Sequence, residues 1–242
     1  MDITSRISYY SNNHLNFSIT VDNYGDFFRR EPMRRTPSKE ITAYGIRVLL
    51  SRHPNIRKLK RDNIPIMHGN KFWASSWLLM DYFKKNGLIK GSKVMEIGCG
   101  WGLAGIYCAK KHNAIVTGTD IDSDVFPFLH LHAELNRVKV NALKKSFDDI
   151  TIKLLSDTDI LIGTDICFWD DMVQRLRRLI KRALRSGTKL ILIADPVRSP
   201  FEKLGEYCIE RLGGEVIDWS INRPRHIQGQ ILKITNPKPL RP

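Results

Sequence analysis

Three glycines at alternate positions, Gly98, Gly100 and Gly102, stand between a strand-like apolar run and an apolar segment with helical spacing. Glycines there let the backbone turn tightly and approach a ligand closely, while the N–H groups of the following helix face that ligand. Glu96 precedes the turn inside the predicted strand, and Asp120 ends the next predicted strand. A carboxylate at that second place can accept both ribose hydroxyls of an adenosine. The spacing therefore predicts a nucleoside-binding crevice.

Two adenosine ligands compete for such a turn. From Gly100 the segment Gly-Trp-Gly-Leu-Ala-Gly satisfies the GxGxxG dinucleotide fingerprint. That fingerprint should begin directly after the strand, however, and from Gly98 the pattern is GxGxG, with Leu103 where the third dinucleotide glycine would stand. Glu96 would repel a pyrophosphate but suits the sulfonium and ammonium of S-adenosylmethionine, which carries no phosphate. We therefore expect S-adenosylmethionine as cofactor, tethered by Glu96 and by Asp120.

Strands and helices alternate from Lys93 onward. The patterns predict strands at 94–97, 114–118, 141–143, 160–163, 189–194, 215–219 and 230–234, and helices at 75–85, 103–112, 124–136, 172–184 and 200–212. This alternation implies an α/β fold, a Rossmann-like seven-stranded and mostly parallel sheet with helices on both faces. Ligands bind such sheets at the carboxyl ends of the strands, so functional residues should follow directly after each strand.

The beginning of the chain reads differently from the rest. Alternating apolar residues at 15–21 predict a short strand, and the apolar series within 38–50 predicts a helix. We expect residues 1–65 to form an N-terminal extension that caps the site. The catalytic domain would then cover residues 66–236, followed by a basic tail at 237–242.

The composition is that of an ordinary globular protein, with 242 residues, 42% hydrophobic and 26% charged. The longest apolar stretches, such as 190–194, fall far short of the ~20 residues that a membrane span needs, so no membrane association is expected. The four cysteines form no CxxC pair and no secretory signal is visible, which predicts a cytoplasmic, reduced protein. His130 and His132 lie two apart on a predicted helix and do not face one another, so no metal site is expected.

Positive charge dominates the sequence, with 39 Lys and Arg against 25 Asp and Glu and a net charge of +14. Three segments, 52–61, 175–189 and 221–242, carry basic residues and no acid. Each basic segment, taken alone, can be explained as a solvent-exposed face of the protein. An acidic partner explains why all three lack acids, and it could be an acidic protein substrate or nucleic acid. The sequence carries no signal for an oligomeric state.

On these motifs, residues 65–236 resemble the class I seven-β-strand S-adenosylmethionine-dependent methyltransferases, and within them the family-16 protein-lysine methyltransferases. The segment 68–83 is similar to that group's lead-in helix with its tryptophan, here Trp73. Asp165-Ile-Cys-Phe168 matches the group's D-x-x-[YF] motif. Asp195-Pro-Val-Arg198 resembles the D-P-x-R of the branch that methylates the electron-transfer flavoprotein β subunit.

The resemblance implies roles for these side chains. Trp73 would lie beside the methyl donor. Asp165 would orient or deprotonate the acceptor amine as a catalytic residue together with Phe168, although a carboxylate there could instead cap the following helix, a role that Asp170 fits better. The substrate channel would be formed by Phe168, Trp169, Asp195 and Arg198.

Adenine recognition is expected from the loop after the third strand. Phe147 would contact the ring, and Asp148 or Asp149 would accept from the exocyclic amine. The Asp-Trp pair often seen in relatives is absent, so either carboxylate could act. Asp122 is predicted to cap the helix that follows it.

The leading hypothesis is a protein-lysine methyltransferase. An RNA methyltransferase, which the basic clusters would favour, a small-molecule N-methyltransferase and a donor-binding scaffold without catalysis remain alternatives. The [DN]-P-P-[YFW] motif of nucleic-acid amino-methyltransferases is absent at 165–168.

Overall fold

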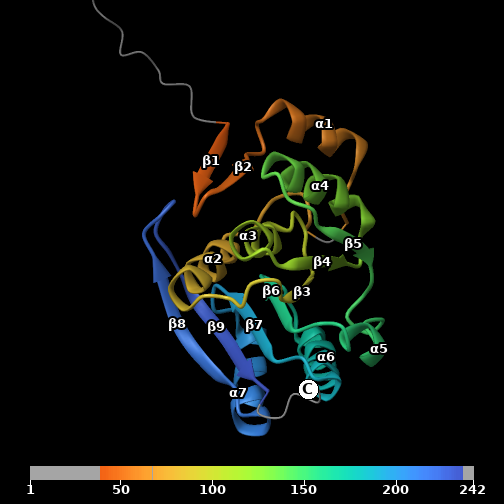
Figure 1. Ribbon diagram of the computed structural model, residues 1–242, viewed down its shortest axis with the longest axis vertical. Helices are drawn as coiled ribbons and strands as arrows, with labels where there is room; N and C mark the ends of the chain where they lie inside the picture. Colours follow the sequence, from red (N-terminus) through yellow and green to blue (C-terminus); the bar gives the residue numbers. More distant parts are fainter. Residues whose placement is uncertain (1–38, 67, 237–242) are drawn as a thin grey trace, which may run out of the picture. The chain divides into compact units, whose positions relative to one another are not determined.

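The computed structural model describes residues 39–66 and 68–236, and a seven-stranded sheet lies at its centre (Figure 1). The expected strand at 15–21 and the tail at 237–242 lie outside the described residues. In spatial order the strands are β5 (Asn141–Lys144), β4 (Ile115–Asp120), β3 (Lys93–Ile97), β6 (Ile160–Thr164), β7 (Leu190–Asp195), β9 (Ile227–Thr235) and β8 (Glu215–Ile221). All seven strands correspond to predicted ones.

The sheet is mostly parallel, as the sequence predicts. Strands β5, β4, β3, β6 and β7 run parallel, whereas β9 is antiparallel to both β7 and β8. After β3 the chain moves outward through β4 and β5, and it then returns to pair β6 with the other side of β3. The strand order therefore reverses between β3 and β6, and a ligand crevice is expected at their carboxyl ends.

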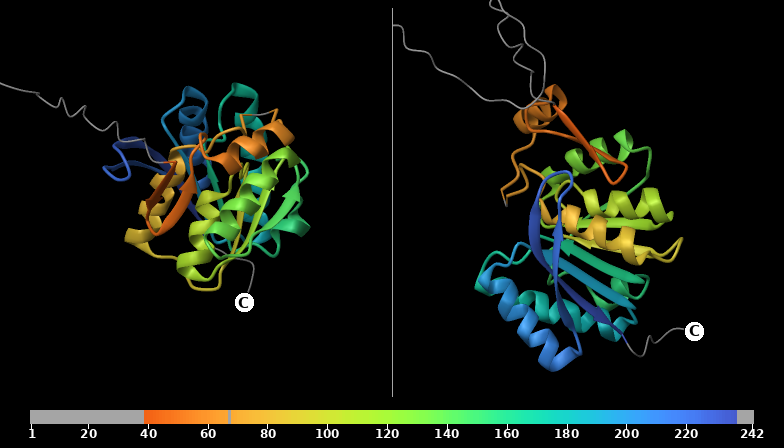
Figure 2. Two further views of the ribbon diagram at one scale, coloured as in Figure 1. Left: turned by 90° about the horizontal axis from the view of Figure 1, so that it is seen from above. Right: turned by 90° about the vertical axis from the view of Figure 1, so that its left-hand side faces the viewer.

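Helices cover both faces of the sheet, which confirms the predicted layers (Figure 2). One face packs against α2 (Ser75–Asn86), α3 (Leu103–His112) and α4 (Phe126–Leu135), which follows the short 3-10 helix η1 (Ser123–Val125). The other face packs against α5 (Ile152–Leu155), α6 (Asp170–Ser186) and α7 (Ser199–Leu212). In α6 the residues at helical spacing that the sequence placed inward, such as Leu176, Leu179 and Ala183, are fully buried. None of the described helices is long and apolar enough to cross a membrane.

The helix expected within 38–50 is wrong, because this segment forms a hairpin of β1 (Glu40–Ala43) and β2 (Ile46–Leu49). Tyr44 and Gly45 connect the strands with φ of 53° and 77°. Positive φ at both central residues is the geometry of the two-residue turns that suit antiparallel strands. The buried residues of β2 alternate with exposed Arg47, so the apolar pattern has the period of a strand.

The hairpin is part of the folded domain. Ile46 and Val48 of β2 are buried in the same core as α3 and α4. Ile56 is buried there too; it belongs to α1 (Pro54–Asp62), a helix that the sequence does not predict. All of the described residues belong to one compact unit. Residues 39–65, predicted as an extension, therefore belong to the domain that was expected to start at residue 66.

Two side chains, one in α4 and one at its C-cap, hold β2 in place. The His132 ring accepts a hydrogen bond from Leu49 N–H at 3.2 Å, and its other nitrogen lies 2.8 Å from the Phe128 carbonyl. Asn136 accepts from Arg47 N–H at 2.9 Å and donates to the Arg47 carbonyl at 2.8 Å. His132 thus has a structural role in joining α4 to β2.

Replacing Ile46 by Ala should lower the free energy of unfolding by about 2–5 kcal/mol, because the change leaves a cavity in the shared core. Urea denaturation should show this loss in a single transition. Thr42→Ala, which alters an exposed residue of the same hairpin, should change stability by no more than about 0.5 kcal/mol. Equal stability of the Ile46 variant and the parent protein would mean that the hairpin is a separable appendage.

Candidate active site

A cavity of about 290 Å³ opens at the carboxyl ends of β3, β4 and β6. Its wall is made by the glycine turn after β3, the loops after β4, β5 and β6, and the segment that leads into α2. This is the place where the strand order reverses, so the fold itself predicts a ligand here. The sequence-predicted residues that line it are Trp73, Gly98, Gly100, Gly102, Asp120, Phe147, Asp165, Phe168 and Trp169.

The glycine turn forms the floor of this cavity. Gly98, Gly100 and Gly102 have φ of 56°, 50° and 68°, a region that residues with a side chain rarely adopt. A Cβ at Gly98 would lie 2.7 Å from Ile166 and 3.9 Å from Phe147. Both of those residues line the cavity, so a side chain at Gly98 would occupy the cradle itself.

Asp120 lies at the end of β4 with its carboxylate at the cavity wall. Its oxygens accept from Gly100 N–H at 3.0 Å and from Asp122 N–H at 3.1 Å. Burial raises the pKa of Asp120, and these two hydrogen bonds oppose the rise. A carboxylate has further acceptor capacity, so Asp120 can still take ribose hydroxyls. Asp122 accepts from Asp124 N–H at 2.9 Å, which confirms the predicted helix cap.

Glu96 does not reach the cavity, and its predicted role as a tether of the donor is corrected here. Its side chain is 1% exposed and accepts from Gly105 N–H at 2.9 Å, in the first turn of α3. Side chains alternate between the two faces of a strand, and Glu96 shares the α3 face with Val94. Its carboxylate holds the first turn of the helix that follows the glycines. Burial raises the pKa of Glu96 to about 8, while the backbone hydrogen bonds lower it.

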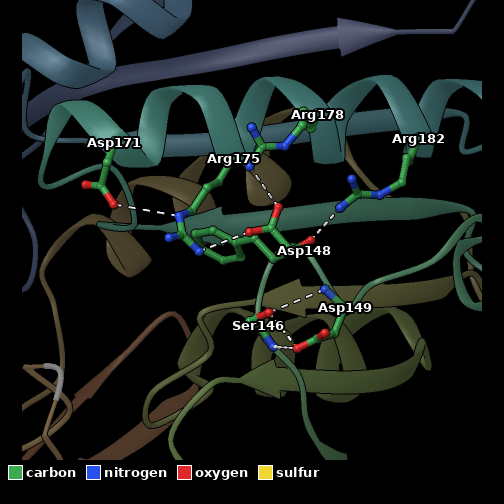
Figure 3. A network of polar contacts seen from close by, with 8 residues as sticks. Ser146, Asp148, Asp149, Asp171, Arg175, Arg178 and Arg182 are labelled. Carbon is green, nitrogen blue, oxygen red and sulfur yellow. Dashed lines mark hydrogen bonds and ion pairs between the residues drawn. The ribbon is translucent and has the colours of Figure 1, made fainter.

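The loop after β5 contributes Phe147 to the wall but neither of its carboxylates. Asp148 forms ion pairs with Arg175 and Arg178 of α6, each at 3.0 Å (Figure 3). Asp149 accepts from the hydroxyl and the N–H of Ser146. Asp148 thus attaches this loop to α6, and the contact of Asp148 or Asp149 with the adenine amine stays a prediction.

Arg182 completes this attachment, since its guanidinium donates to the carbonyls of Phe147 and Ile150. The cluster at 175–189 lacks acids along the sequence, yet acids from another loop lie beside it in space. Part of the positive charge of α6 thus serves to hold the loop after β5 at the cavity wall.

Asp165 is the most constrained polar residue of the site. It has φ of 55° and is 4% exposed. Its carboxylate accepts from Ser75 N–H at 3.0 Å, in the first turn of α2, and from the Arg198 guanidinium at 2.9 Å. It does not cap α6, which begins at Asp170. The carboxylate of Asp165 ties the start of α2 and the loop after β7 to the end of β6.

Asp195 supports the ion pair of Asp165 with Arg198 and does not line the cavity. It is fully buried, and its carboxylate binds the Arg198 N–H at 2.8 Å and guanidinium at 2.6 Å. Burial raises the pKa of Asp195 to about 6, against the lowering effect of Arg198. Arg198 is not part of the cavity wall, and its guanidinium packs at 4.3 Å against the ring of Phe168. The predicted channel residues Asp195 and Arg198 thus support the wall from behind.

Aromatic side chains form a further part of the cavity wall. The rings of Trp73 and Phe168 meet edge to face, with centroids 5.1 Å apart. His68, which the sequence analysis did not select, lies 5.2 Å from Phe168 and 5.6 Å from Trp169. Lys71 sits 4.1 Å above the Trp73 ring. His68 and its neighbours thus surround the mouth of the cavity with flat surfaces.

His68 carries two marks of a functional residue. Its φ is 56°, and its backbone carbonyl is held by the Trp73 indole N–H at 3.2 Å. Its ring nitrogens have no hydrogen-bond partner within the described part of the chain. The sequence offers one signal that could have indicated His68, namely its position directly before Gly69 and ahead of Trp73. Within residues 39–66 and 68–236 no group of three or more His, Cys, Asp or Glu could hold a metal ion.

The cavity fits S-adenosylmethionine in shape and in chemistry. The glycine turn leaves a cradle that a Cβ would fill, Asp120 offers a ribose acceptor, and Phe147 offers a ring surface for the adenine. When bound, this cofactor supplies a methyl group on a positively charged sulfur. Gly98, Gly100, Asp120 and Phe147 are the residues that would hold its adenosine part.

Gly98→Ala should weaken binding of S-adenosylhomocysteine at least about tenfold, because the added methyl enters the cradle next to Ile166. Calorimetric titration measures this affinity. Gly213→Ala is the matched control, since Gly213 also has positive φ, 64°, but a Cβ there meets nothing within 4 Å. Both variants carry backbone strain of roughly 1–2 kcal/mol, so an equal loss of affinity in both would contradict the assignment of the cradle.

Glu96→Gln should alter how stability depends on pH. A buried carboxyl with a raised pKa holds its proton in the folded state at pH values where the unfolded state has lost it, so stability falls as pH rises from about 4.5 toward 8. Relative to the Gln variant, the parent should lose on the order of 2 kcal/mol between pH 6 and 8. Urea unfolding across this range measures the difference. Glu134→Gln, at an exposed site of α4, should keep the parent's profile; parallel profiles for the parent and Glu96→Gln would refute the expectation.

Some relatives of the chain are protein methyltransferases by name, whereas the Ubiquinone biosynthesis O-methyltransferase of Coxiella burnetii is 36% identical over 111 residues, which cover 46% of this chain and 47% of the relative. The Histidine protein methyltransferase 1 homolog of Dictyostelium discoideum is 32% identical over 142 residues, which cover 55% of this chain and 45% of the relative. The electron transfer flavoprotein beta subunit lysine methyltransferase of Homo sapiens is 24% identical over 159 residues, covering 64% and 59%. The chain thus spans about half the length of the curated relatives it matches.

Solved structures share the fold. A methyltransferase from Pyrococcus furiosus superposes with a TM-score of 0.53 at 17% identity, covering 75% of this chain and 96% of that one. The tRNA (uracil-54, C5)-methyltransferase of Pyrococcus abyssi, solved with S-adenosyl-L-homocysteine, gives a TM-score of 0.51 at 18% identity, covering 82% and 43%. At these identities the likeness confirms the predicted Rossmann-like α/β fold.

Residues 56–204, more than half of the chain, match the lysine methyltransferase family. The match confirms the predicted resemblance to family-16 methyltransferases and, with it, S-adenosylmethionine as the cofactor. The chain therefore belongs to the lysine methyltransferase family, a group of S-adenosylmethionine-dependent enzymes.

Proposed function

We propose that this protein transfers a methyl group from S-adenosylmethionine to a side-chain nitrogen of a protein, with lysine as the acceptor. The observation that carries the proposal is the aromatic wall of Trp73, Phe168 and His68, which lines the same cavity as the glycine turn. An alkyl chain that ends in nitrogen can pass along such faces toward the methyl group, and aromatic faces attract a cationic head. The names of the histidine and lysine protein methyltransferases among the relatives support a protein acceptor.

The reaction needs a neutral, aligned nitrogen more than a strong acid or base. The lone pair of the nitrogen forms the new C–N bond, the electrons of the S–C bond remain on sulfur, and one proton leaves the nitrogen. Positioning in line can account for much of the rate. The glycine turn and the aromatic wall, which line one cavity, would supply this alignment.

Asp165 acts in this proposal as a positioning residue. Its oxygens are already bound by Ser75 N–H and Arg198, so it could take a proton from the amine only by giving up one of these partners. The His68 imidazole, at the cavity mouth and without a hydrogen-bond partner in the described residues, is placed to receive the proton and pass it to water. The ion pair of Asp165 with Arg198 keeps Phe168 in place.

A histidine acceptor is the second candidate. The Dictyostelium discoideum relative, named as a histidine protein methyltransferase homolog, shares 32% identity. The site itself offers a reason, because Lys71 and Arg198 lie against the aromatic wall and cations there disfavour a charged ammonium. A neutral imidazole would meet no such repulsion.

The acceptor class can be tested by incubating the protein with tritiated S-adenosylmethionine and a cell lysate. Label should appear in protein, resist ribonuclease, and map to methyl-lysine by mass spectrometry. Methyl-histidine would move the acceptor to the second candidate. Label confined to RNA or to small molecules would overturn the proposal. The Gly98→Ala variant serves as the control for background labelling.

Phe168→Ala should lower kcat/KM for the labelled protein by about 10- to 100-fold, a loss of roughly 1.4–2.7 kcal/mol of transition-state stabilisation. The ring supports His68 and Arg198, and its removal loosens the wall. Phe168→Tyr keeps the ring and should retain activity within a few-fold. Affinity for S-adenosylhomocysteine, measured by calorimetry, should be similar in both variants. Full activity of the Ala variant would exclude the aromatic wall from catalysis.

A further inference from the structure

A second pocket, of about 740 Å³, lies at the edge of the sheet opposite the candidate active site. Ile115 and Val116 begin β4 and Asn141 begins β5, and all three line this pocket. The two strands run parallel, so the pocket lies at their amino ends. From Ile115 to Asp120, β4 spans roughly 17 Å, which separates the pocket from the cavity of the glycine turn. We call it the amino-edge pocket.

Positive side chains from three parts of the chain line the amino-edge pocket. Arg47 comes from β2, Lys110 from α3, and Arg137 and Lys139 from the segment between α4 and β5. No acid among the described residues lines it. Arg47 is paired with Glu40 at 2.9 Å. The other three cations form no ion pair with any residue that the structure describes.

These cations lie close enough to act on one another. Burial, and then three neighbouring positive charges, lower the pKa of Lys110. The neighbours are Lys111, Arg137 and Arg47. The Lys110 ammonium donates to a neutral group, the Asn136 amide oxygen, at 3.3 Å. Like charges held together disfavour their charged forms, so an anion that entered the pocket would relieve a repulsion already present in the free protein.

The ends of two helices account for only part of this charge. Both α3 and α4 end at the pocket, since their C-caps, Asn113 and Asn136, line it. A helix C-terminus carries about −0.5 of a charge, so the two ends offset roughly one of the three unpaired cations. About two positive charges are left. A carboxylate would balance one of them, whereas a phosphate monoester, with about −1.5 to −2 charges at pH 7, balances both.

The backbone and two amide side chains add to the case for an anion. Asn113 and Asn141 are exposed at the pocket, and their amide groups are donors with no side-chain hydrogen bond in the described part of the chain. Arg137 has φ of 59° directly after the cap of α4. Helices usually end in glycine at this place, and an arginine there is strained. A need for positive charge at the pocket accounts for the arginine.

The floor of the pocket is apolar. Ile115 is 56% exposed although it lies in a strand of the central sheet. Further apolar residues line the same space: Ala109, Val116, Leu135 and Val138. Sites for small molecules measure about 300–1,000 Å³ and join an apolar wall to a few polar groups. The volume and the lining of this pocket therefore suit a small ligand with an apolar part.

We propose that the amino-edge pocket binds a small molecule that joins a phosphate group to an apolar or flat body, as a nucleoside monophosphate does. The phosphate would lie among Lys110, Arg137 and Lys139, and the body would cover Ile115. A nucleic-acid strand carries one charge per phosphate and would leave a cation unbalanced. The pocket is independent of the proposed methyl transfer, because it shares no lining residue with the cofactor cavity.

Calorimetric titration with uridine monophosphate, uridine and inorganic phosphate tests the pocket. The protein is first saturated with S-adenosylhomocysteine, so that the cofactor cavity is closed to the probes. Uridine monophosphate should bind at least about tenfold more tightly than inorganic phosphate, because its body covers Ile115, and uridine alone should not bind. Equal affinities for the two phosphate probes, or no binding of uridine monophosphate, would overturn the proposal.

The double variant Arg137→Gln, Lys139→Gln should bind uridine monophosphate at least about tenfold more weakly than the parent. The matched control is Arg185→Gln, Lys153→Gln, which removes one arginine and one lysine at exposed positions outside the pocket. This control should keep the parent's affinity. Both double variants should bind S-adenosylhomocysteine as the parent does, which shows that they fold. An equal loss in the two would mean that net charge attracts the probe, and the site would be refuted.

A uridine oligonucleotide separates a small ligand from nucleic acid. The oligonucleotide should bind no more tightly than uridine monophosphate, and the two double variants should weaken it to the same extent, as expected for attraction by net charge. If it binds more tightly than uridine monophosphate and loses its affinity only through the changes at Arg137 and Lys139, the pocket is part of a nucleic-acid surface and the proposal is wrong.

Discussion

A buried carboxylate that must be paired sets the geometry of this site. Asp165 is 4% exposed, and an unpaired charge at such a place would be strongly destabilising. Its two partners, Ser75 N–H and Arg198, belong to the start of α2 and to the loop after β7. Three segments far apart in sequence therefore meet at one side chain. The aromatic wall lies on these same segments, so its shape follows from the pairing of a single charge.

Much of the fold could be predicted because the parallel sheet has strong local signals. Short apolar strands alternate with amphipathic helices, and the glycine turn marks the first crossover. The hairpin of β1 and β2 was misread as a helix, although Tyr44-Gly45 and the exposed Arg47 between buried neighbours carry the signature of a turn between strands. In a segment as short as 38–50, the helical period of 3.6 and the strand period of 2 are hard to tell apart when most positions are apolar.

Whether a predicted site residue lies in the cavity wall depends on its place relative to a strand end. Residues that follow a strand end, such as Asp120 and Phe168, lie in the cavity wall as predicted. Glu96 stands inside a strand, where alternation sends its side chain to α3. Asp148 and Asp195 were chosen by residue type and position, but nearby arginines bind both. The sequence shows that a carboxylate lies on a loop. It does not show which cation or backbone N–H binds that carboxylate, because the partner can come from an element distant in the chain.

The same competition explains why net charge is a poor guide to the partner. The acid-free cluster of α6 meets Asp148 in space, and it holds the loop after β5 through Arg175, Arg178 and Arg182. Lys145, which lines the cavity, lies close enough to Asp149 to lower the pKa of that carboxyl, after the larger effect of the hydrogen bonds from Ser146. The net charge of +14 is the excess of bases over acids, so these ion pairs use up none of it. It counts the excess bases but does not say which of them lie free at the surface, and only those can attract a partner, because charges already paired gain little from a new one.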